Sequence, residues 1–416
     1  MEFTKSQKDA ISAAGSTILV SAAAGPGKTF TLTQRIIKSI IGDGENCADI
    51  SRTLIVTFTR AAAAELKIRI SSALSRAIAE HPSDSRLQKQ LIMLGNAKIS
   101  TIDSFFTEPV RANFEKLGFS STPRLADSAE LEETREQILA NVLDGFFEKY
   151  DVCSDLRLTP LGYSNDFTEL LTIFSGTRDA QDIYSNLFEL YSKLITSPRG
   201  VNQLKDAAQK LEDDSQKEFF LTDVGKFVSG YLISLYKNCS DIFESLSEKA
   251  SDDELLREKY LPVLQSDAER CRTLIIKTNS GYAQAKDAFI NCKTVKITAL
   301  KSNDKSNLSE YIKNTRSKLN KLINEAGKAF LNFDEEEIKN DFKKSSEYCM
   351  LLYSLLDRFD RLYAEEKRAK GVCEFSDMPR YMLKILQNED GTPSDAADNL
   401  YNSFDEVYID EYQDVN

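Results

Sequence analysis

The segment Ser21–Thr29 limits the fold of this chain more than any other feature. It reads Ser-Ala-Ala-Ala-Gly-Pro-Gly-Lys-Thr and joins a short apolar stretch to a predicted helix. Small residues let backbone N–H groups close around phosphate oxygens, and the helix that follows adds the positive end of its dipole. A glycine-rich turn with a chance Lys-Thr pair is the alternative, but the flanking strand and helix favour a phosphate-binding loop.

If the loop binds a nucleotide, its last two residues have different roles. Lys28 would reach the β- and γ-phosphates, and the Thr29 hydroxyl would hold Mg²⁺. Alanine at position 22 replaces the glycine of the strict pattern, and Pro26 removes one N–H donor. We expect the nucleotide to contact Ala22, Ala23, Ala24, Gly25, Pro26, Gly27, Lys28 and Thr29.

Short apolar segments around the loop predict an α/β domain with a parallel sheet flanked by helices. Four of them have the composition of buried strands: Ser16–Ser21, Arg52–Phe58, Ala97–Thr101 and Asp405–Asp410. Helices are predicted at Thr29–Ile41 and Ala61–Glu80, the second with an apolar stripe at Leu66, Ile70, Leu74 and Ile78. Alternating strands and helices are typical of α/β folds.

Residues 126–370 differ from the flanking segments in proline content and in the spacing of apolar residues. They contain three prolines, Pro160, Pro198 and Pro262, and repeated helical stripes such as Val228, Tyr231, Leu232, Leu235, Ile242 and Leu246. A further stripe is Leu352, Leu355, Phe359 and Leu362. We therefore predict residues 1–125 as the first part of the α/β domain, 126–370 as an all-helical insertion, and 371–416 as the return to the α/β domain.

The acidic segment Val407–Asp414 follows the last predicted strand. Such a strand would bring Asp410 to the metal ion beside the loop, and Glu411 could polarise an attacking water as a general base. Gln413 could contact the γ-phosphate or that water. An acidic surface turn is the alternative, which the loop in the same chain makes less favourable. The predicted catalytic residues are Lys28, Asp410, Glu411 and Gln413.

Charge and cysteine content exclude few classes of protein. The net charge is -12, but the first 110 residues carry +3, so net charge does not decide whether nucleic acid is a partner. The seven cysteines form no C-x-x-C pair and His81 is the only histidine, so the spacing builds no zinc or iron–sulfur site. With no secretory leader and no long apolar run, we expect a cytoplasmic protein with reduced thiols.

The loop and the acidic motif together resemble superfamily 1A DNA helicases of the UvrD, Rep and RecB kind, and most closely the AddA group of ATP-dependent helicase/nucleases. The resemblance includes Phe3–Ile11, similar to the family's Q motif, in which the glutamine, here Gln7, reads the adenine edge. It implies a RecA-like P-loop NTPase domain. Phe30 stands where many members have an arginine that packs on the adenine, so stacking here would be aromatic.

Two further segments look like the family's contacts with single-stranded DNA. They are Val56–Leu66 and Ile99–Phe105. Phe58 offers a stacking face to bases, although a strand-end phenylalanine more often belongs to a core. The remaining expected DNA contacts are to phosphates: Thr57, Thr59, Arg60, Thr101 and Ser104.

Some positions depart from the family pattern. Asp103 replaces a common histidine, and its carboxylate would repel the DNA backbone, while Arg60 replaces a common asparagine and could offset that charge. Spacing alone makes Thr101 and Ser104 helix caps. Gly371–Met378 resembles the element that leads back from the insertion, with a structural role.

The resemblance implies ATP and Mg²⁺ as ligands, DNA as a partner, and an AddB-like second subunit. It implies 3′-to-5′ movement on single-stranded DNA in recombination and double-strand-break repair. The second RecA-like lobe and its arginine finger have no counterpart in these 416 residues, so we expect weak ATP binding and no unwinding by this segment alone. The alternatives are a non-catalytic nucleotide- or DNA-binding module, and a clamp-type ATPase, whose Leu-Ser-Gly-Gly signature and long heptads are missing.

Overall fold

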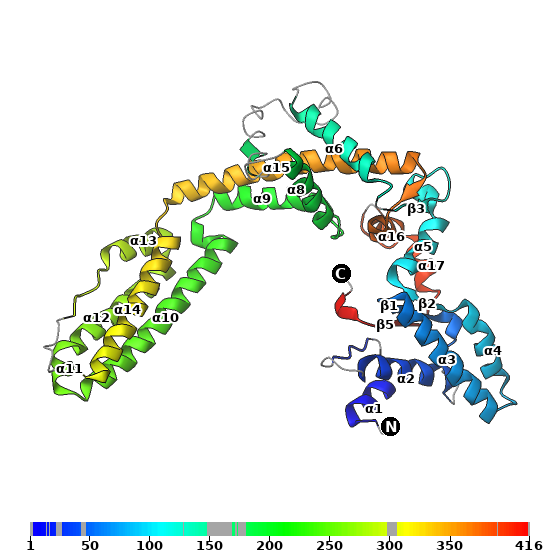
Figure 1. The fold of residues 1–416 in the computed structure, drawn as a ribbon, viewed down its shortest axis with the longest axis horizontal. Coiled ribbons are helices and arrows are strands. Elements are labelled where there is room, and N and C mark those ends of the chain that lie inside the picture. The colour runs from blue at the N-terminus through cyan, green and yellow to red at the C-terminus, as the bar shows by residue number, and fades with distance from the viewer. Residues whose placement is uncertain are drawn as a thin grey trace. The chain divides into compact units, whose positions relative to one another are not determined.

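The computed structural model describes residues 3–13, 15, 17–21, 27–42, 47–127, 129–147, 169–170, 173, 180–297, 306–388 and 390–414 (Figure 1). The chain forms two compact units. The sheet unit contains Met1–Arg157, Phe174–Gly200 and Leu356–Asn416, and the helical unit contains Leu158–Ile173 and Val201–Leu355. Within the ranges described, none of the helices has the length and apolarity needed to cross a membrane.

The main sheet has three parallel strands in the order β2-β1-β5. β1 (Thr53–Thr57) lies in the centre and is buried along its whole length, as a strand covered on both faces must be. β2 (Lys98–Thr101) places Thr101 opposite Thr57, and β5 (Glu406–Ile409) places Ile409 opposite Val56. Three of the four predicted strands are therefore confirmed.

The fourth predicted strand, Ser16–Ser21, is wrong for its described residues Thr17–Ser21, which form no strand. Ile18, Leu19 and Val20 are 38%, 77% and 47% exposed. The outer edge of β5, where Val407 is 56% exposed, pairs with no described strand. An apolar run predicts that side chains prefer burial, but only pairing with a neighbour makes it a strand.

The helices beside the sheet form its core. α2 (Gly27–Ile41), α3 (Arg60–Glu80) and α4 (Ser85–Met93) share one cluster with the sheet, and the short helices η1 (Ile50–Arg52) and η2 (Leu94–Asn96) join it. The fully buried members of that cluster include Ile36, Ile40, Ile50, Ile55, Leu66, Ile70 and Leu74. Both helices predicted in this region are confirmed, with the predicted stripe facing the core.

A second core of the sheet unit lies around α5 (Ile102–Ala112) and α16 (Met378–Leu386), which pack side by side (Figure 1). η3 (Phe114–Leu117), α17 (Asp395–Tyr401) and the parallel pair β3 (Arg124–Leu125) and β4 (Val372–Cys373) complete it. Its buried residues are Val110, Leu117, Phe119, Cys373, Met378, Met382 and Ile385. This core rigidly joins the segment after β2 to the segment that returns from α15.

A buried ionic network fixes that return. α15 (Glu335–Ala369) ends near Lys367, which is 2% exposed and whose ammonium lies 2.6 Å from Asp377 Oδ1 and 3.2 Å from Glu374 Oε2. Glu374 precedes and Asp377 ends the short helix η6 (Phe375–Asp377). A buried ammonium needs such partners, so the contacts support the structural role expected of Gly371–Met378.

Two more helices of the sheet unit, α6 (Glu132–Phe147) and α8 (Ala180–Leu194), precede α15 in the chain. Tyr191 of α8 donates a 2.6 Å hydrogen bond to Asp360, which also holds Arg380 through contacts of 2.8 and 2.7 Å. Burial by itself would raise the pKa of the Asp360 carboxyl. The hydrogen bonds and the positive charge of Arg380 have the larger combined effect, and the pKa of Asp360 is therefore lowered. Asp360 is therefore an anion at neutral pH.

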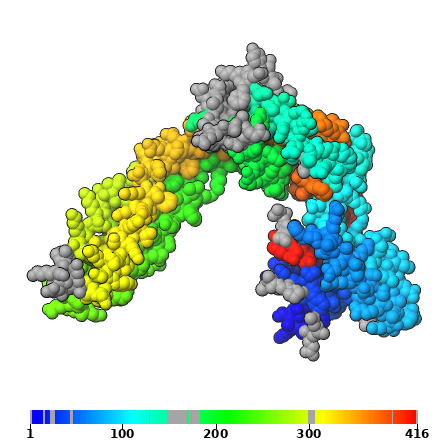
Figure 2. All heavy atoms as spheres, viewed as in Figure 1, coloured from blue at the N-terminus to red at the C-terminus, as the bar shows by residue number. Residues whose placement is uncertain are grey.

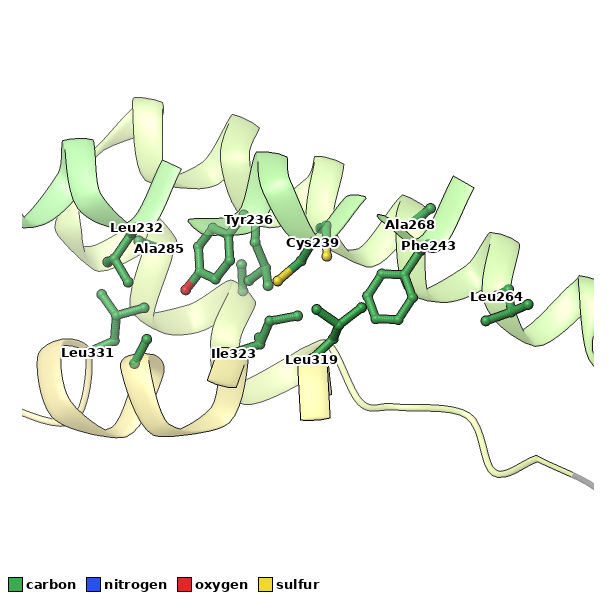
Figure 3. Close-up of a cluster of buried hydrophobic side chains, with 14 of the residues drawn as sticks. Leu232, Tyr236, Cys239, Phe243, Leu264, Ala268, Ala285, Leu319, Ile323 and Leu331 are labelled. Atoms are coloured by element: carbon green, nitrogen blue, oxygen red, sulfur yellow. The ribbon is translucent and has the colours of Figure 1, made fainter. Parts of the chain in front are cut away.

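Every described element of the helical unit is a helix. Its helices are α9 (Asn202–Ser215), η4 (Phe219–Leu221), α10 (Asp223–Ser251), α11 (Glu254–Lys259), α12 (Leu261–Ser280), α13 (Tyr282–Asn291), α14 (Asn307–Phe330) and the first part of α15. Figure 3 shows Leu232, Tyr236 and Phe243 of α10 facing Leu319 and Ile323 of α14 across one continuous core. Arg316 and Asp267, both largely buried, form an ion pair in this unit.

Cysteines of the described residues are free thiols, as expected. Cys239, Cys271 and Cys373 are buried, whereas Cys47, Cys292 and Cys349 are half-buried. Burial raises the pKa of Cys271 to about 12, which keeps its thiol protonated and unreactive.

Candidate functional site

The carboxyl edge of the main sheet gathers three of the predicted motifs. Phe58 follows β1, Ile102 follows β2, and Asp410 follows β5. The Asp410 backbone N–H donates to the Val56 carbonyl at 2.9 Å, which holds the acidic motif against the end of β1. Ligands of open parallel sheets bind at this edge, so the topology brings the motifs to a place where they can act together.

The phosphate-binding loop leads into the first turn of α2. Ala22, Ala23, Ala24, Gly25 and Pro26 lie outside the described residues, whereas Gly27, Lys28 and Thr29 begin the helix. The Lys28 ammonium has no hydrogen bond or ion pair to any described residue. A lysine at a helix N-terminus with no partner of its own can bind an incoming phosphate.

Gln7 packs against the start of α2. Its side-chain oxygen accepts a 3.0 Å hydrogen bond from the Thr4 backbone N–H, as part of a capping box at the start of α1 (Lys5–Ser12). Its amide nitrogen lies 3.5 Å from the position that a Cβ on Gly27 would take. This amide donor therefore lies beside the helix end that follows the loop.

An aromatic pair lies in the same place. The Phe3 and Phe30 rings stack with centroids 5.7 Å apart and an interplanar angle of 22°. The Arg35 guanidinium also ties α2 to α1 through a 2.7 Å hydrogen bond to the Ala10 carbonyl. The structure thus brings predicted residues Gln7 and Phe30 together at the start of α2. Sequence reasoning missed the role of Phe3, although the Thr4-x-x-Gln7 capping signature was readable.

The acidic motif has an unusual backbone. Glu411 has φ of 53°, the only left-handed residue other than glycine among those described. Its backbone N–H donates to Asp410 Oδ1 at 3.1 Å, and its carboxylate accepts from the Gln413 amide. Left-handed backbone costs energy in a residue with a Cβ and is concentrated at functional sites, so this geometry supports a role for Glu411 beyond a surface turn.

Phe58 does not belong to the core. Its side chain is 65% exposed, although every residue of β1 before it is buried. Thr59 begins α3 by accepting a 3.1 Å hydrogen bond from the Ala62 N–H, and Arg60 is exposed on the first turn. An exposed aromatic ring beside a cation suits stacking on bases and contact with phosphates.

The threonine hydroxyls of this edge have local partners. Thr57 is buried, and its hydroxyl donates to the Thr59 carbonyl at 3.0 Å, which shapes the turn after β1. Thr101 caps α5 by accepting from the Ser104 N–H at 3.3 Å, and their hydroxyls lie 2.8 Å apart. The helix-cap interpretation of Thr101 is confirmed, and direct contacts of these hydroxyls with DNA stay predictions.

The two predicted metal ligands, Thr29 and Asp410, are both oxygen donors. No cluster of three or more His, Cys, Asp or Glu residues with the geometry of a metal site occurs in the described part of the chain. Mg²⁺ usually takes one or two protein oxygens and completes its shell with water and substrate phosphates. The Thr29 hydroxyl and the Asp410 carboxylate are oxygen ligands of that kind.

Comparison with known proteins agrees with this arrangement. The model of the UvrD/REP helicase N-terminal domain matches residues 3–416. This chain belongs to the UvrD/REP helicase family. The UvrD/REP match covers both the motif-bearing sheet unit and the helical unit.

Curated relatives cover the chain from end to end. Proteins named as the AddA component of an ATP-dependent helicase/nuclease are 32% identical over 422 residues in Thermoanaerobacter sp. (strain X514) and 30% identical over 424 residues in Clostridium acetobutylicum. A third, from Clostridium novyi (strain NT), is 28% identical over 417 residues. Each match covers 100% of this chain but 32–33% of the relative, so this UvrD/REP chain spans about a third of their length.

Proposed function

We propose that this chain is the nucleotide-binding part of an ATP-dependent DNA helicase whose ATP and DNA sites share the carboxyl edge of the main sheet. The observation that carries the proposal is the pairing of β1 with both β2 and β5. That pairing puts Phe58, Thr101 and Asp410 at neighbouring strand ends. ATP hydrolysis beside Asp410, at the end of β5, could then move the DNA contact of Phe58, at the end of the neighbouring strand β1.

The packing of α2 against β5 supports a shared metal site for Thr29 and Asp410. Ser39 of α2 donates a 2.7 Å hydrogen bond to Glu406 at the start of β5, and Figure 2 shows the red end of the chain against the blue N-terminal helices. Thr29 lies ten residues before Ser39, about 15 Å along a helix. Asp410 lies four residues beyond Glu406, about 13 Å along a strand. An antiparallel helix and strand would therefore bring both to the same level.

The residues have distinct roles in this proposal. Lys28 neutralises charge on the β- and γ-phosphates, and Gln7 and Phe30 face the base. Thr29 and Asp410 hold Mg²⁺, which supplies positive charge to the phosphates when bound. Glu411 orients and deprotonates the attacking water, with Gln413 fixing its carboxylate.

DNA binds next to this site through stacking on Phe58. Stacking does not depend on base identity, which suits a motor that must move along any sequence. Thr59, Arg60, Thr101 and Ser104 contact the backbone beside it, and Arg60 offsets the Asp103 carboxylate. Thr57 acts by shaping the turn or by direct contact.

The finer features follow the family resemblance. We propose 3′-to-5′ movement on single-stranded DNA in recombination and double-strand-break repair, with an AddB-like partner protein. Residues 126–370 would be the helical insertion of the motor domain, since every described element in that range is a helix. The 416 residues alone would bind ATP weakly and not unwind DNA, because the arginine finger is not among their motifs.

Titration of the 416-residue chain with a fluorescent ATP analogue in Mg²⁺ tests the nucleotide site. Lys28→Ala is expected to weaken binding about 10–100-fold, because a hydrogen bond between charged groups is worth roughly 1.5–3 kcal/mol. Lys38→Ala is the matched control, since Lys38 is exposed near the other end of the same helix. Equal affinity of wild type and Lys28→Ala would refute the nucleotide site. DNA-stimulated ATP turnover that Lys28→Ala abolishes would refute the inactivity of the segment.

A further inference from the structure

A hollow of about 540 Å³ on the sheet unit lies away from the strand ends described above. Lys116, Pro198, Arg380, Leu383, Lys384, Gln387 and Asn388 line it. None of these described lining residues is acidic, although the chain carries a net charge of -12. The described lining residues of this hollow thus supply three cations and no carboxylate.

The cations of this hollow, here called the α16 hollow, are not equivalent. Arg380 is held from behind by Asp360, through the two short contacts already described. Lys116 and Lys384 are exposed and make no hydrogen bond or ion pair with any described residue. Two ammonium groups with no partner among the described residues thus line this open space together with the exposed Gln387 amide and with Arg380, whose charge is paired with Asp360.

A second, larger hollow differs from the α16 hollow because both cations and carboxylates line it. It measures about 750 Å³ and is lined by Lys8, Lys38 and Arg86 but also by Glu80 and Asp84. Arg86 is already bound to the carbonyls at the end of α2 at 3.0 and 3.2 Å. The carboxylates of this hollow offset its cations, whereas the described lining of the α16 hollow has no carboxylate, although Arg380 there is itself paired with Asp360.

The position of the α16 hollow relates it to the candidate DNA contacts. Lys116 lies on η3, just after α5, and Lys384 lies on α16, which packs along α5 in the same core. Thr101 and Ser104 lie at the opposite end of α5. This helix has 11 residues, a length of about 16 Å. At 3.4 Å per nucleotide of a B-form strand, that spans about five nucleotides.

We propose that the α16 hollow is a second DNA-backbone site, in which Lys116, Lys384 and Arg380 bind phosphates about five nucleotides from those held at Thr101 and Ser104. This inference rests on the proposed function, because it assumes that DNA lies at the carboxyl edge. The site carries no sequence information, since lysine and arginine contacts with phosphate position DNA without reading bases. It extends the DNA path along α5 and increases the length of strand that the motor holds.

Salt dependence of DNA binding tests this site. A fluorescently labelled oligonucleotide of about 20 nucleotides, long enough to span both sites at 3.4 Å per nucleotide, is titrated with the 416-residue chain over a range of NaCl concentrations. Each lost phosphate contact on a single strand lowers the slope of log K against log[salt] by about 0.7, or about fivefold in affinity at 0.1 M salt. The Lys116→Ala/Lys384→Ala variant is expected to lose about two such contacts.

Two control variants show whether the lower slope comes from this hollow or from the loss of any two positive charges. Arg76→Ala/Lys89→Ala removes two exposed cations from α3 and α4 and is expected to leave the slope unchanged. Lys116→Arg/Lys384→Arg restores the charge and is expected to restore the slope. An unchanged slope for Lys116→Ala/Lys384→Ala would refute the inference, and so would an equal loss in the control variant.

Two further outcomes distinguish the alternatives. If wild type binds no DNA at low salt, the proposed function itself is wrong, and the inference with it. If Lys116→Ala/Lys384→Ala binds DNA with the wild-type slope but no longer binds inorganic tripolyphosphate, the hollow binds free polyphosphate and DNA is excluded as its occupant.

Discussion

The sheet unit and the helical unit satisfy packing rules to different degrees. In the helical unit, large side chains such as Phe243 and Leu232 are fully buried in one continuous core. In the sheet unit, β1 is equally buried, but Phe58 directly after it is 65% exposed and Glu411 adopts a left-handed backbone. The only left-handed residue other than glycine among those described thus lies at the carboxyl edge, where ligands are proposed, and functional sites are where natural proteins accept a cost in stability.

Removing a buried ring should affect the helical unit alone. Phe243→Ala is expected to lower the free energy of unfolding of that unit by about 3–5 kcal/mol, because transfer energy is lost and a cavity is left. Hydrogen exchange of peptides from α10 and α14 measures this loss. ATP-analogue affinity of the sheet unit should stay at the wild-type value, and an equal drop in that affinity would contradict the independence of the two units.

Removing an exposed ring from the sheet unit should weaken DNA binding and leave the stability of the fold unchanged. Phe58→Ala is expected to weaken single-stranded DNA binding by about 1–3 kcal/mol, the usual worth of one base stacked on an aromatic ring. The melting temperature should hardly change, because the ring buries little surface. Fluorescence anisotropy with a labelled oligonucleotide measures the affinity.

Phe227→Ala is the control for Phe58→Ala. Phe227 is 77% exposed on α10 of the helical unit, so it matches Phe58 in residue type and exposure but not in place. Its replacement should leave DNA affinity unchanged. If both variants lose affinity equally, exposed aromatic surface rather than the carboxyl edge binds the DNA.

The left-handed residue gives a smaller effect. Glu411→Gly should be more stable than Glu411→Ala by about 1 kcal/mol, because glycine adopts positive φ without the steric cost that alanine pays. Both variants lack the carboxylate, so the pair isolates the backbone from the side chain. Thermal unfolding of the two variants measures the difference, and a more stable alanine variant would show that φ at 411 is not positive in solution.

Local sequence signals predicted much of the sheet unit. The strands at 53–57, 98–101 and 406–409 and the helices at 27–41 and 60–80 lie where apolar periodicity put them. The capping box of Thr4 and Gln7 was not predicted, although both residues fit the usual pattern at a helix start. Such features depend on neighbours in the chain, and their motifs were readable for the same reason.

Features that depend on contacts distant in sequence could not be predicted. Residues 17–21 have strand composition but no strand partner, and no local signal announced that. The Ser39–Glu406 and Arg52–Asp405 contacts join residues more than 350 positions apart. The left-handed backbone of Glu411 had no local signal either, and the exposure of Phe58 was predicted only from the family resemblance, because a strand-end phenylalanine more often belongs to a core.

The smallest expected effect concerns an ion pair that joins β1 to β5. The Arg52 guanidinium makes two 2.6 Å contacts with the Asp405 carboxylate, and these hydrogen bonds lower the pKa of Asp405. A lowered pKa in the folded state stabilises the fold above the unfolded-state pKa of about 3.9, and the gain is lost as pH falls through the folded-state pKa. Both side chains are about half exposed, so water screens the pair and the gain is small.

Melting temperatures of wild type and Asp405→Asn test this joint between the strands. The wild type should be slightly more stable at pH 7, and the difference should shrink as the pH falls through the folded-state pKa of Asp405 and its carboxylate becomes protonated. It should also shrink at about 1 M NaCl, where the screening length is roughly 3 Å. Equal melting temperatures at pH 7 would contradict the prediction and would mean that main-chain hydrogen bonds, such as the 2.8 Å bond from the Asp405 N–H to the Arg52 carbonyl, join the strands without help from the ion pair.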